Sequence, residues 1–407
     1  MSAPQPGFDP TDPDVNEAGF PHEQLAQMRR TAPVSWVEQV PEAYAGFENA
    51  PGYWAVSRHA DVAAVSKDNK NFSTRENGAI IRFAPDMTRE QVEVQSVMLI
   101  NHDAPEHTRY RQVISRGFTP RAINALRDDL EKRTHQIVAA ARDKGHGNFV
   151  EDIAAELPLQ AIADLLGVPQ EDRAKLFDWS NQMMGYDDPE YDVDPEAASI
   201  EILMYFMAMA EDRKANPRDD LVTKLISADV DGHELSADEF GYFVILLTVA
   251  GNETTRNAIT HGMHAFFQNP DQWELFKAER PASTYDEVIR WATPVTVFQR
   301  TALNDCQVGG QAVRKGERVG LFYASANHDE DVFTDPHRFD ITRTPNPHVA
   351  FGGHGAHYCI GANLARMEVE LAFNIIADLI PDIAQAGEPR RLRHGWINGI
   401  KELQVTY

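Results

Sequence analysis

The segment from Phe351 to Gly361, FGGHGAHYCIG, places one cysteine among glycines and histidines. Cys359 lies where a glycine-rich loop meets the start of an apolar, helix-periodic stretch, and both a helix N-terminus and free loop amides favour the thiolate form of cysteine. Gly355 and Gly361 lie four residues before it and two after it, so we expect the backbone there to approach a flat ligand closely. A single cysteine thiolate is the ligand that holds a haem iron when the O–O bond of oxygen is to be cleaved.

Two other interpretations of this segment remain open from the residues alone. A free cysteine is most often a small apolar core residue without a chemical role. His354, His357 and Cys359 could instead hold zinc in a hydrolase, which requires three or four converging ligands. Their spacing matches no standard zinc pattern, and a zinc protein of this kind would be colourless.

A second segment with polar groups interrupts an apolar helix. Ser236 and Glu239 form the pattern of a capping box, and the helical periodicity after them extends to about Gln268. About 32 helical residues would span about 48 Å, enough to cross a domain. The run AGNETT, from Ala250 to Thr255, breaks the apolar face: its glycine weakens the helix, and a threonine hydroxyl can bond back to a carbonyl one turn earlier. Taken alone, the segment is also consistent with a core helix that has an incidental polar turn.

The composition restricts the classes of protein to consider. The chain has 407 residues, 43% hydrophobic and 25% charged, which are ordinary globular values and exclude a disordered or fibrous chain. The net charge of −24 repels phosphate backbones, so nucleic acid is not an expected partner. Two cysteines, Cys306 and Cys359, are too few for a disulfide framework and indicate a reducing compartment. The N-terminus lacks a signal-peptide pattern and no apolar run approaches the roughly 20 residues of a membrane span, so we expect a cytoplasmic protein that is not integral to a membrane.

The predicted elements are mostly helical. Residues 1–20, with prolines at positions 4, 6, 10 and 13, are predicted to form an irregular arm without a helix, and residues 21–407 to form a single domain. Helical patterns dominate from about residue 120 to 276 and return in a long last helix that begins near Cys359. β-branched and aromatic residues predict short strands at 34–37, 52–57, 297–303, 307–313 and 318–323. We therefore expect a mainly α fold with a small β subdomain.

Together these segments resemble the cytochrome P-450 superfamily of haem-thiolate monooxygenases, from about Phe20 to the C-terminus. The resemblance implies the P-450 fold, with one haem b between the long central helix and the Cys-loop helix, and Cys359 as the axial ligand of its iron. It also implies that Glu287 and Arg290, in the sequence EVIR, form a buried ion pair that Arg338 of the sequence DPHRF completes. At i,i+3 the first two side chains share one helix face. As an isolated surface pair they would contribute under about 1 kcal/mol.

The haem that the resemblance implies needs partners for its two propionates. Four basic residues, His107, Arg111, Arg300 and His357, stand where the family places these partners. Arginine forks match carboxylates well. Taken singly, each of the four could equally be a solvated charge or part of a capped loop.

The same resemblance assigns roles on the oxygen side of the haem and beside the sulfur. Ala250 and Gly361 are expected to contact the cofactor, and Gly251 is expected to leave room for O₂ above the iron. Glu253 and Thr254 resemble the acid–alcohol pair that passes protons through water to the bound oxygen.

Longer stretches narrow the resemblance to bacterial steroid 26/27-hydroxylases, which oxidise the terminal methyl group of a cholesterol or cholestenone side chain. These stretches are FGGHGAHYCIGANLAR, AGNETTRNAITHG, RWATPVTVFQRTA, VMLINHDAPEHTRYRQVISRGFTPRAI and the closing WINGIK. The resemblance implies an apolar substrate pocket that suits a steroid tail. Its expected residues are Ile81, Phe83, Val97, Met98, Leu99, Val249, Ala250, Val295 and Val297. Each of these could equally be ordinary core packing.

The resemblance also implies partners. Electrons would come from a ferredoxin-type donor reduced by an NAD(P)H-dependent reductase, because no reductase domain fits in the chain, and O₂ would be the second substrate. A related alternative is the hydroxylation of a branched lipid or terpenoid methyl group. An alternative of another class is a haem sensor or carrier that binds a ligand without turnover, and Glu253 and Thr254 argue against it.

The sequence departs from the usual family pattern in the cysteine loop. The family commonly has phenylalanine seven residues before the cysteine, but here Gly352 has that place and Phe351 lies eight residues before Cys359. The loop therefore has one extra residue. We expect axial ligation to be retained, because the spacing of glycine, histidine and cysteine next to the sulfur is intact.

Overall fold

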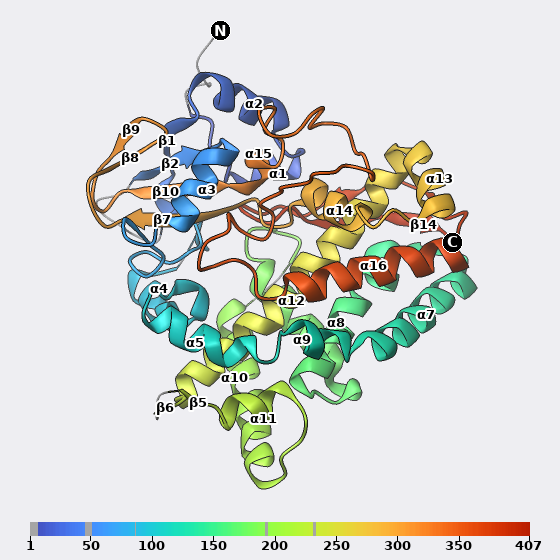
Figure 1. The fold of residues 1–407 in the computed structure, drawn as a ribbon. Helices are drawn as coiled ribbons and strands as arrows, with labels where there is room; N and C mark the ends of the chain where they lie inside the picture. The colour runs from blue at the N-terminus through green and yellow to red at the C-terminus, as the bar shows by residue number, and fades with distance from the viewer. Residues whose placement is uncertain (1–6, 45–50, 86, 192–193, 231–232) are drawn as a thin grey trace.

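The structure of the protein is a computed structural model that describes residues 7–44, 51–85, 87–191, 194–230 and 233–407 (Figure 1). The longest helix, α12 (Ala237–Gln268), runs through the middle of the molecule, and α16 (Ala362–Leu379) packs beside it (Figure 1). The other α-helices are α1 (Pro13–Glu17), α2 (His22–Thr31), α3 (His59–Lys67), α4 (Arg89–Val94), α5 (Glu106–Ser115), α6 (Pro120–Asn124), α7 (Arg127–Lys144), α8 (Glu156–Leu166), α9 (Arg173–Met184), α10 (Pro195–Ala215), α11 (Leu221–Ile226), α13 (Pro270–Glu279), α14 (Thr284–Ala292) and α15 (Tyr323–Ala326). No helix within these ranges is long and apolar enough to cross a membrane.

Helix α12 forms where the capping signal and the apolar periodicity predict it. The Ser236 hydroxyl accepts from the Glu239 backbone N–H at 3.2 Å, and the Glu239 carboxylate accepts from the Ser236 N–H at 2.8 Å. These bonds satisfy donors that have no partner within the helix. The helix then packs against α8, α9, α10, α14 and α16, so most of its surface is buried in one large apolar core.

The β-rich part lies at one side of the helices (Figure 1). Its main sheet has the strand order β1-β2-β10-β7-β3, in which β10 is parallel to β2 and antiparallel to β7. These strands are β1 (Val34–Glu38), β2 (Gly52–Val56), β3 (Phe72–Ser73), β7 (Val297–Ala302) and β10 (Arg318–Phe322). The short strands outside this sheet are β4 (His146–Asn148), β5 (Asp229–Val230), β6 (His233–Glu234), β8 (Cys306–Val308), β9 (Gln311–Val313), β11 (Ala384–Gln385), β12 (Arg390–Arg391), β13 (Ile400–Glu402) and β14 (Gln404–Thr406). The prediction of a mainly α fold with a small β part is confirmed.

Three local predictions differ from the structure. Residues 13–17 form the helix α1 inside the arm that was expected to be irregular, because Pro13 stands at the first helical position, where no backbone N–H is needed. The strand expected over 307–313 is a hairpin, because Gly309 and Gly310 both adopt positive φ, at 54° and 84°, and reverse the chain. The last long helix begins at Ala362 rather than at Cys359.

Candidate functional site

Cys359 lies on the loop that leads into α16, and its backbone N–H donates to the Phe351 carbonyl at 2.9 Å. Burial raises the pKa of its thiol, while the Gly361 N–H and the charges of Arg111 and Arg366 act in the opposite direction. The side chain is nevertheless exposed, although protein surrounds it. Both observations hold together if the sulfur faces an internal space, and in such a place a metal cation is what stabilises the thiolate.

The four basic residues expected at the propionates come together from three elements. His107 and Arg111 lie on α5, Arg300 lies on β7, and His357 lies two residues before the cysteine. The His107 and His357 rings are 4.2 Å apart, and Arg111 donates to the backbone carbonyl of the residue before Cys359.

This basic cluster lacks acidic partners. Burial and neighbouring positive charges, Arg111 foremost, lower the pKa of His107 to about 4; burial and Arg300 lower that of His357 well below its usual value. Among the described residues, neither Arg111 nor Arg300 forms a salt bridge with a carboxylate; Arg300 donates instead to the Gln299 carbonyl at 2.7 Å. A group that carries two carboxylates would supply the missing negative charge.

The central helix presents one accessible stripe toward the interior. Ala250 is exposed and Thr254 is half-buried, although both lie near the middle of α12, and they share a face because they are four residues apart. The Thr254 hydroxyl donates to the Ala250 carbonyl at 2.7 Å. Glu253 is buried, forms an ion pair with Arg256 and accepts from Asn257 Nδ2 at 2.8 Å. The acid and the alcohol of the expected relay therefore have separate partners here.

Two glycines have packing roles that the sequence did not predict. A Cβ on Gly251 would lie 2.3 Å from the Ile162 side chain of α8, so Gly251 allows α12 to pack closely on α8, and its role beside O₂ stays a prediction. A Cβ on Gly355 would lie 1.7 Å from the Ser66 carbonyl, so Gly355 allows the cysteine loop to pack on α3 and not on a ligand. A Cβ on Gly361 would lie 3.8 Å from Cys359 Sγ, which places this glycine directly beside the sulfur.

The extra residue of the cysteine loop is accommodated by unusual backbone conformations. Gly352 and His354 adopt φ values of 94° and 64°, in the left-handed region. Phe351 still reaches the cysteine, since its carbonyl accepts from Cys359 N–H, and its ring lies 4.7 Å from the Arg366 guanidinium. The extra residue is therefore accommodated between Phe351 and Gly355. The spacing from Gly355 to Cys359, which is expected to retain axial ligation, is unchanged.

Glu287 and Arg290 belong to a buried network of ionic hydrogen bonds. Arg290 donates to both carboxylate oxygens of Glu287, at 2.8 and 2.9 Å, and both side chains are 0% exposed. The third member is Arg343, whose Nε donates to Glu287 at 3.1 Å. Arg338, which was expected in this place, is exposed and contributes only its backbone carbonyl, so that prediction is wrong. The chain turns after Arg338 in such a way that the arginine five residues later points inward.

The expected substrate residues divide into three places. Ile81, Val249, Val295 and Val297 pack in one apolar cluster, which also includes Met184 and Trp396. Phe83 belongs to a separate small cluster with Val92. Met98 and Leu99 pack against the large helical core, while Val97 and Leu99 line a small cavity. The structure therefore brings four of the residues together and leaves the others apart.

Sequence reasoning missed two charged residues of this region. Arg343 could have been found only as a second arginine near the DPHRF motif. Glu368, on α16, is 1% exposed and neither of its carboxylate oxygens has a hydrogen-bond partner. Burial raises its pKa to about 8, with Thr255 as the neighbour that acts in the opposite direction. An acidic residue at an apolar position of the last long helix was the available signal.

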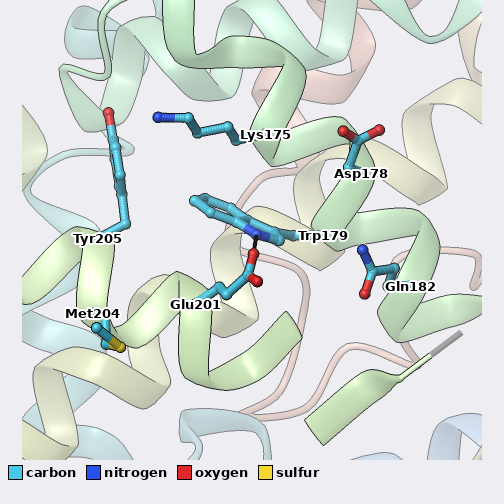
Figure 2. Close-up of a pocket in the computed structure, with 7 residues that line it drawn as sticks. All are labelled: Lys175, Asp178, Trp179, Gln182, Glu201, Met204 and Tyr205. Atoms are coloured by element: carbon cyan, nitrogen blue, oxygen red, sulfur yellow. Dashed lines mark hydrogen bonds between the residues drawn. The ribbon is translucent and has the colours of Figure 1, made fainter. Parts of the chain in front are cut away.

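Two other candidate sites, a zinc site and a surface cavity, are not alternatives to the site around Cys359. His354, His357 and Cys359 do not form a group of converging metal ligands within the described chain, so the zinc interpretation has no support. An open surface cavity of about 410 Å³ lies between α9 and α10 and is lined by Lys175, Asp178, Trp179, Gln182, Glu201, Met204 and Tyr205 (Figure 2). The Trp179 indole donates to Glu201 there at 2.7 Å. None of these residues belongs to the elements that carry Cys359 or the basic cluster.

The residues present fit a haem. The sulfur donor beside an internal space, the basic cluster without acidic partners and the accessible stripe of α12 match its iron, its two propionates and one of its faces. The chain belongs to the cytochrome P450 family and is a monooxygenase of that family, which uses a haem-iron cofactor. The family model described as Cytochrome P450 matches residues 283–377.

Several known proteins are similar over nearly the whole chain. The Steroid C26-monooxygenase of Rhodococcus jostii is 62% identical over 98% of this chain and 85% of its own length, and that of Mycolicibacterium smegmatis is 58% identical over 98% and 93%. The Methyl-branched lipid omega-hydroxylase of Mycobacterium tuberculosis is 40% identical over 97% and 92%. A solved structure of a Mycobacterium marinum cytochrome P450 in complex with pseudoionone superposes with a TM-score of 0.91, at 36% identity, over 100% of both chains.

Proposed function

We propose that this cytochrome P450 hydroxylates the terminal methyl group of a steroid side chain, such as that of cholesterol or cholest-4-en-3-one. The observation that carries the proposal is the 58–62% identity, over 98% of this chain, to relatives named Steroid C26-monooxygenase. At this identity the apolar cluster around Val249 and Val297 is expected to serve the same class of substrate. Further turnovers of the alcohol to the aldehyde and the acid follow from the same chemistry.

The cofactor in this proposal is haem b, which supplies the iron that activates O₂ and transfers one of its atoms to the substrate. Cys359 binds the iron as a thiolate. Arg111 and Arg300 neutralise the two propionates, His107 and His357 donate hydrogen bonds to them, and the deep position of this cluster strengthens the bonds of the two guanidinium groups. Gly361 keeps the space beside the sulfur free of a side chain.

Thr254 and Glu253 move protons in this proposal. The Thr254 hydroxyl is the polar group on the accessible stripe of α12, and rotation about one bond takes its proton from the Ala250 carbonyl to a water molecule in the interior. Glu253 exchanges protons with solvent only after it leaves Arg256 and Asn257. Its release is therefore the slower part of proton delivery.

The substrate side is apolar. Ile81, Val249, Val295 and Val297 offer no charge and no hydrogen-bonding side chain, so they favour a hydrocarbon tail over a carboxylate or sugar. This cluster joins α12 to the start of β7, which places hydrocarbon contacts next to the accessible stripe with Ala250 and Thr254. The remaining expected residues, Phe83, Val97, Met98 and Leu99, lie outside this cluster and stay proposed pocket residues.

A second candidate substrate class is a methyl-branched lipid. It is favoured by the 40% identity to the Methyl-branched lipid omega-hydroxylase of Mycobacterium tuberculosis. The chemistry would be the same, because a branched lipid also ends in an unactivated methyl group that needs an apolar channel.

The electron donor in this proposal is a ferredoxin-type protein reduced by an NAD(P)H-dependent reductase in the cytoplasm. Two free cysteines without a disulfide are compatible with that reducing compartment. Arg116 and Arg121, which are both exposed near α5 and α6, offer local positive charge for an acidic donor on a chain whose net charge is −24.

The test combines a binding spectrum with product analysis. Cholest-4-en-3-one, cholesterol and a branched fatty acid are titrated into the purified haem protein, and turnover products are identified by mass spectrometry. We expect the two sterols to displace the resting water ligand at lower concentration than the branched acid and to give the terminal alcohol. Preference for the branched acid would favour the second candidate, and no displacement by any of them would refute both.

Two variants test the assigned residues in the same assay. Cys359→Ala should abolish the red-shifted ferrous–CO band of a thiolate-ligated haem. Thr254→Ala should keep that band but divert reducing equivalents from product to hydrogen peroxide. An unchanged ratio of product to reductant consumed in Thr254→Ala would count against the proton role.

A further inference from the structure

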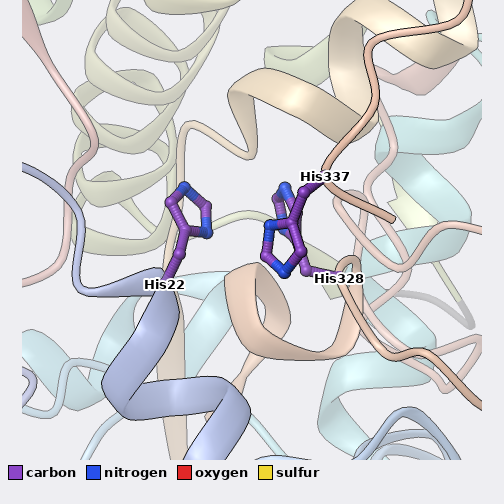
Figure 3. A group of neighbouring side chains, drawn as sticks. All are labelled: His22, His328 and His337. Atoms are coloured by element: carbon purple, nitrogen blue, oxygen red, sulfur yellow. The ribbon is translucent and has the colours of Figure 1, made fainter. Parts of the chain in front are cut away.

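Three histidines outside the haem site converge although they are far apart in the sequence. His22 is the first residue of α2, His328 follows α15, and His337 lies in the loop that leads toward the cysteine segment. Their ring centroids are 4.4 Å (His22–His328), 5.3 Å (His328–His337) and 5.7 Å (His22–His337) apart. One ring nitrogen of each lies within 4.8 Å of the others (Figure 3).

The surroundings fix which nitrogen of His328 is available. Its Nδ1 lies 3.0 Å from the Ala324 carbonyl, and since a carbonyl only accepts, Nδ1 must carry the proton. Nε2 of the neutral ring is then left with its lone pair. A ligating histidine is commonly held in this way, by a carbonyl on its other nitrogen. His328 is 2% exposed, and burial favours this neutral form.

We propose that His22, His328 and His337 form a binding site for a divalent transition-metal ion of the zinc type, with water as the fourth ligand. Three imidazoles with an open fourth position are an established tetrahedral arrangement for zinc. In such a site the ligand nitrogens lie about 3.3 Å apart, so the present separations of at most 4.8 Å require only a small closure. His337 is exposed and His22 half-buried, which gives the ion and the water a path from solvent.

Of the guanidinium groups that act on His22, two are paired with carboxylates, whereas Arg391 donates, among the described residues, only to the Asn16 carbonyl and to Asn398 Oδ1. Arg29 donates to Glu330 at 2.9 Å, and Arg290 donates to Glu287 at 2.8 Å. Each of these two guanidinium groups is therefore paired with a carboxylate, which reduces its repulsion of a cation at the histidine rings. A bound ion would join α2 to the segment that follows α15, next to the Glu287–Arg290–Arg343 network, and would hold the N-terminal part of the chain on this framework.

The test measures the zinc bound to the haem-loaded protein. The iron content of the same sample gives the number of haem-loaded molecules. Untagged enzyme is dialysed against a chelator, incubated with a small molar excess of zinc and separated from free metal, and both metals are measured by mass spectrometry. We expect about one zinc per iron, and a thermal unfolding midpoint that rises with zinc. The variants His337→Ala and His22→Ala should retain less than about 0.2 zinc per iron.

The control variant is His135→Ala, which removes an exposed histidine of α7 that lies outside the group. It should bind zinc as the unchanged protein does. Because His337 is exposed, its variant is expected to fold and to keep the ferrous–CO band, so a loss of zinc there reports the site and not the fold. Less than about 0.2 zinc per iron in the unchanged protein, or equal zinc in His337→Ala, would overturn the proposal. The result is independent of the identity of the substrate.

Discussion

Glu287 on α14 and Glu368 on α16 are carboxylates of equal burial, at 0% and 1% exposure, on helices that contact each other. Glu287 accepts hydrogen bonds from Arg290 and Arg343 and also from the Asp340 N–H at 3.0 Å and Asn346 Nδ2 at 3.1 Å. Within the described chain, Glu368 has no arginine and no backbone N–H as a partner; the Thr255 hydroxyl is its polar neighbour. Burial alone therefore does not decide the surroundings of an acid in this protein: four donors hold the Glu287 carboxylate in a framework, whereas burial without an ionic partner raises the pKa of Glu368 to about 8.

The difference has a structural consequence. The network around Glu287 connects α14 to the loop of residues 334–346, which runs toward the cysteine segment, so its ionic bonds hold elements distant in sequence. Glu368 forms no ion pair with the residues that the structure describes, and its polar neighbour is Thr255, the residue that follows the proposed proton carrier on α12. The first carboxylate holds the fold together, and the second reduces its stability as soon as it loses its proton.

The largest effect is expected from Glu287→Gln. The change leaves Arg290 and Arg343 without a negative partner, and loss of one partner of a buried ion pair commonly costs about 3–5 kcal/mol. We expect the free energy of unfolding to fall by this amount, together with reduced haem retention. Urea unfolding followed by circular dichroism is the measurement, and a loss under about 1 kcal/mol would mean that the network does not support the fold.

The second prediction concerns pH and Glu368. Its pKa of about 8 in the folded protein lies above the usual 4.5, so the folded state holds the proton more tightly than the unfolded state. Between these two values the stability contributed by this group falls as pH rises, by about 1.4 kcal/mol per pH unit, and below pH 4.5 it is constant.

Glu368→Gln should remove this dependence. The variant and the unchanged protein are unfolded with urea at pH 5, 6 and 7, and the difference between their free energies of unfolding should grow in favour of the variant with each step. Glu279→Gln, at an exposed position of α13, serves as the control and should follow the unchanged protein. A constant difference across these pH values would show that Glu368 titrates normally.

The third prediction compares the stability lost when each of two arginines in the loop of residues 334–346 is removed. Arg343→Ala removes the bond to Glu287 and three bonds to backbone carbonyls, those of Thr334, Asp335 and Arg338, and should cost about 1–3 kcal/mol. Arg338→Ala removes an exposed side chain and should change stability by less than about 0.5 kcal/mol. Equal losses in the two variants would restore the role of Arg338 that the sequence motif implied.

The sequence predicted the features that depend on local signals and missed those that depend on residues from other elements. Helix α12 was predictable because the capping box and the apolar period are local signals, and the strands at 34–37 and 318–323 were predictable from side-chain type. The positions of His107, Arg111, Arg300 and His357 around one place followed from the resemblance, and the structure brings them together.

The remaining errors share a cause. Gly355 was assigned to a flat ligand, yet Ser66, which is distant in sequence, occupies the space beside it, and the packing of Gly251 on Ile162 was not foreseen either. Arg343 replaces Arg338 because the chain between them turns, with Asp335 in a positive-φ conformation at 48° before the turn. Glu368 was missed because its burial depends on the packing of α16 against α12. In each case the deciding neighbour comes from another element, and no local pattern reports it.

A small effect is also expected from Asn252→Leu, and it extends the comparison from acids to amides. Asn252 and Asn257 lie on the same helix and are 1% and 0% exposed, but neither polar atom of the Asn252 side chain has a partner, whereas Asn257 donates to Glu253 and accepts from the Ile400 N–H at 3.1 Å. Replacing an unpartnered buried amide by an apolar group of the same shape costs little, so Asn252→Leu should change the free energy of unfolding by less than about 1 kcal/mol. Asn257→Leu leaves Glu253 Oε1 and the Ile400 N–H without these partners and should cost about 2–3 kcal/mol. If Asn252→Leu were as costly as Asn257→Leu, the Asn252 amide would have to be satisfied by buried water.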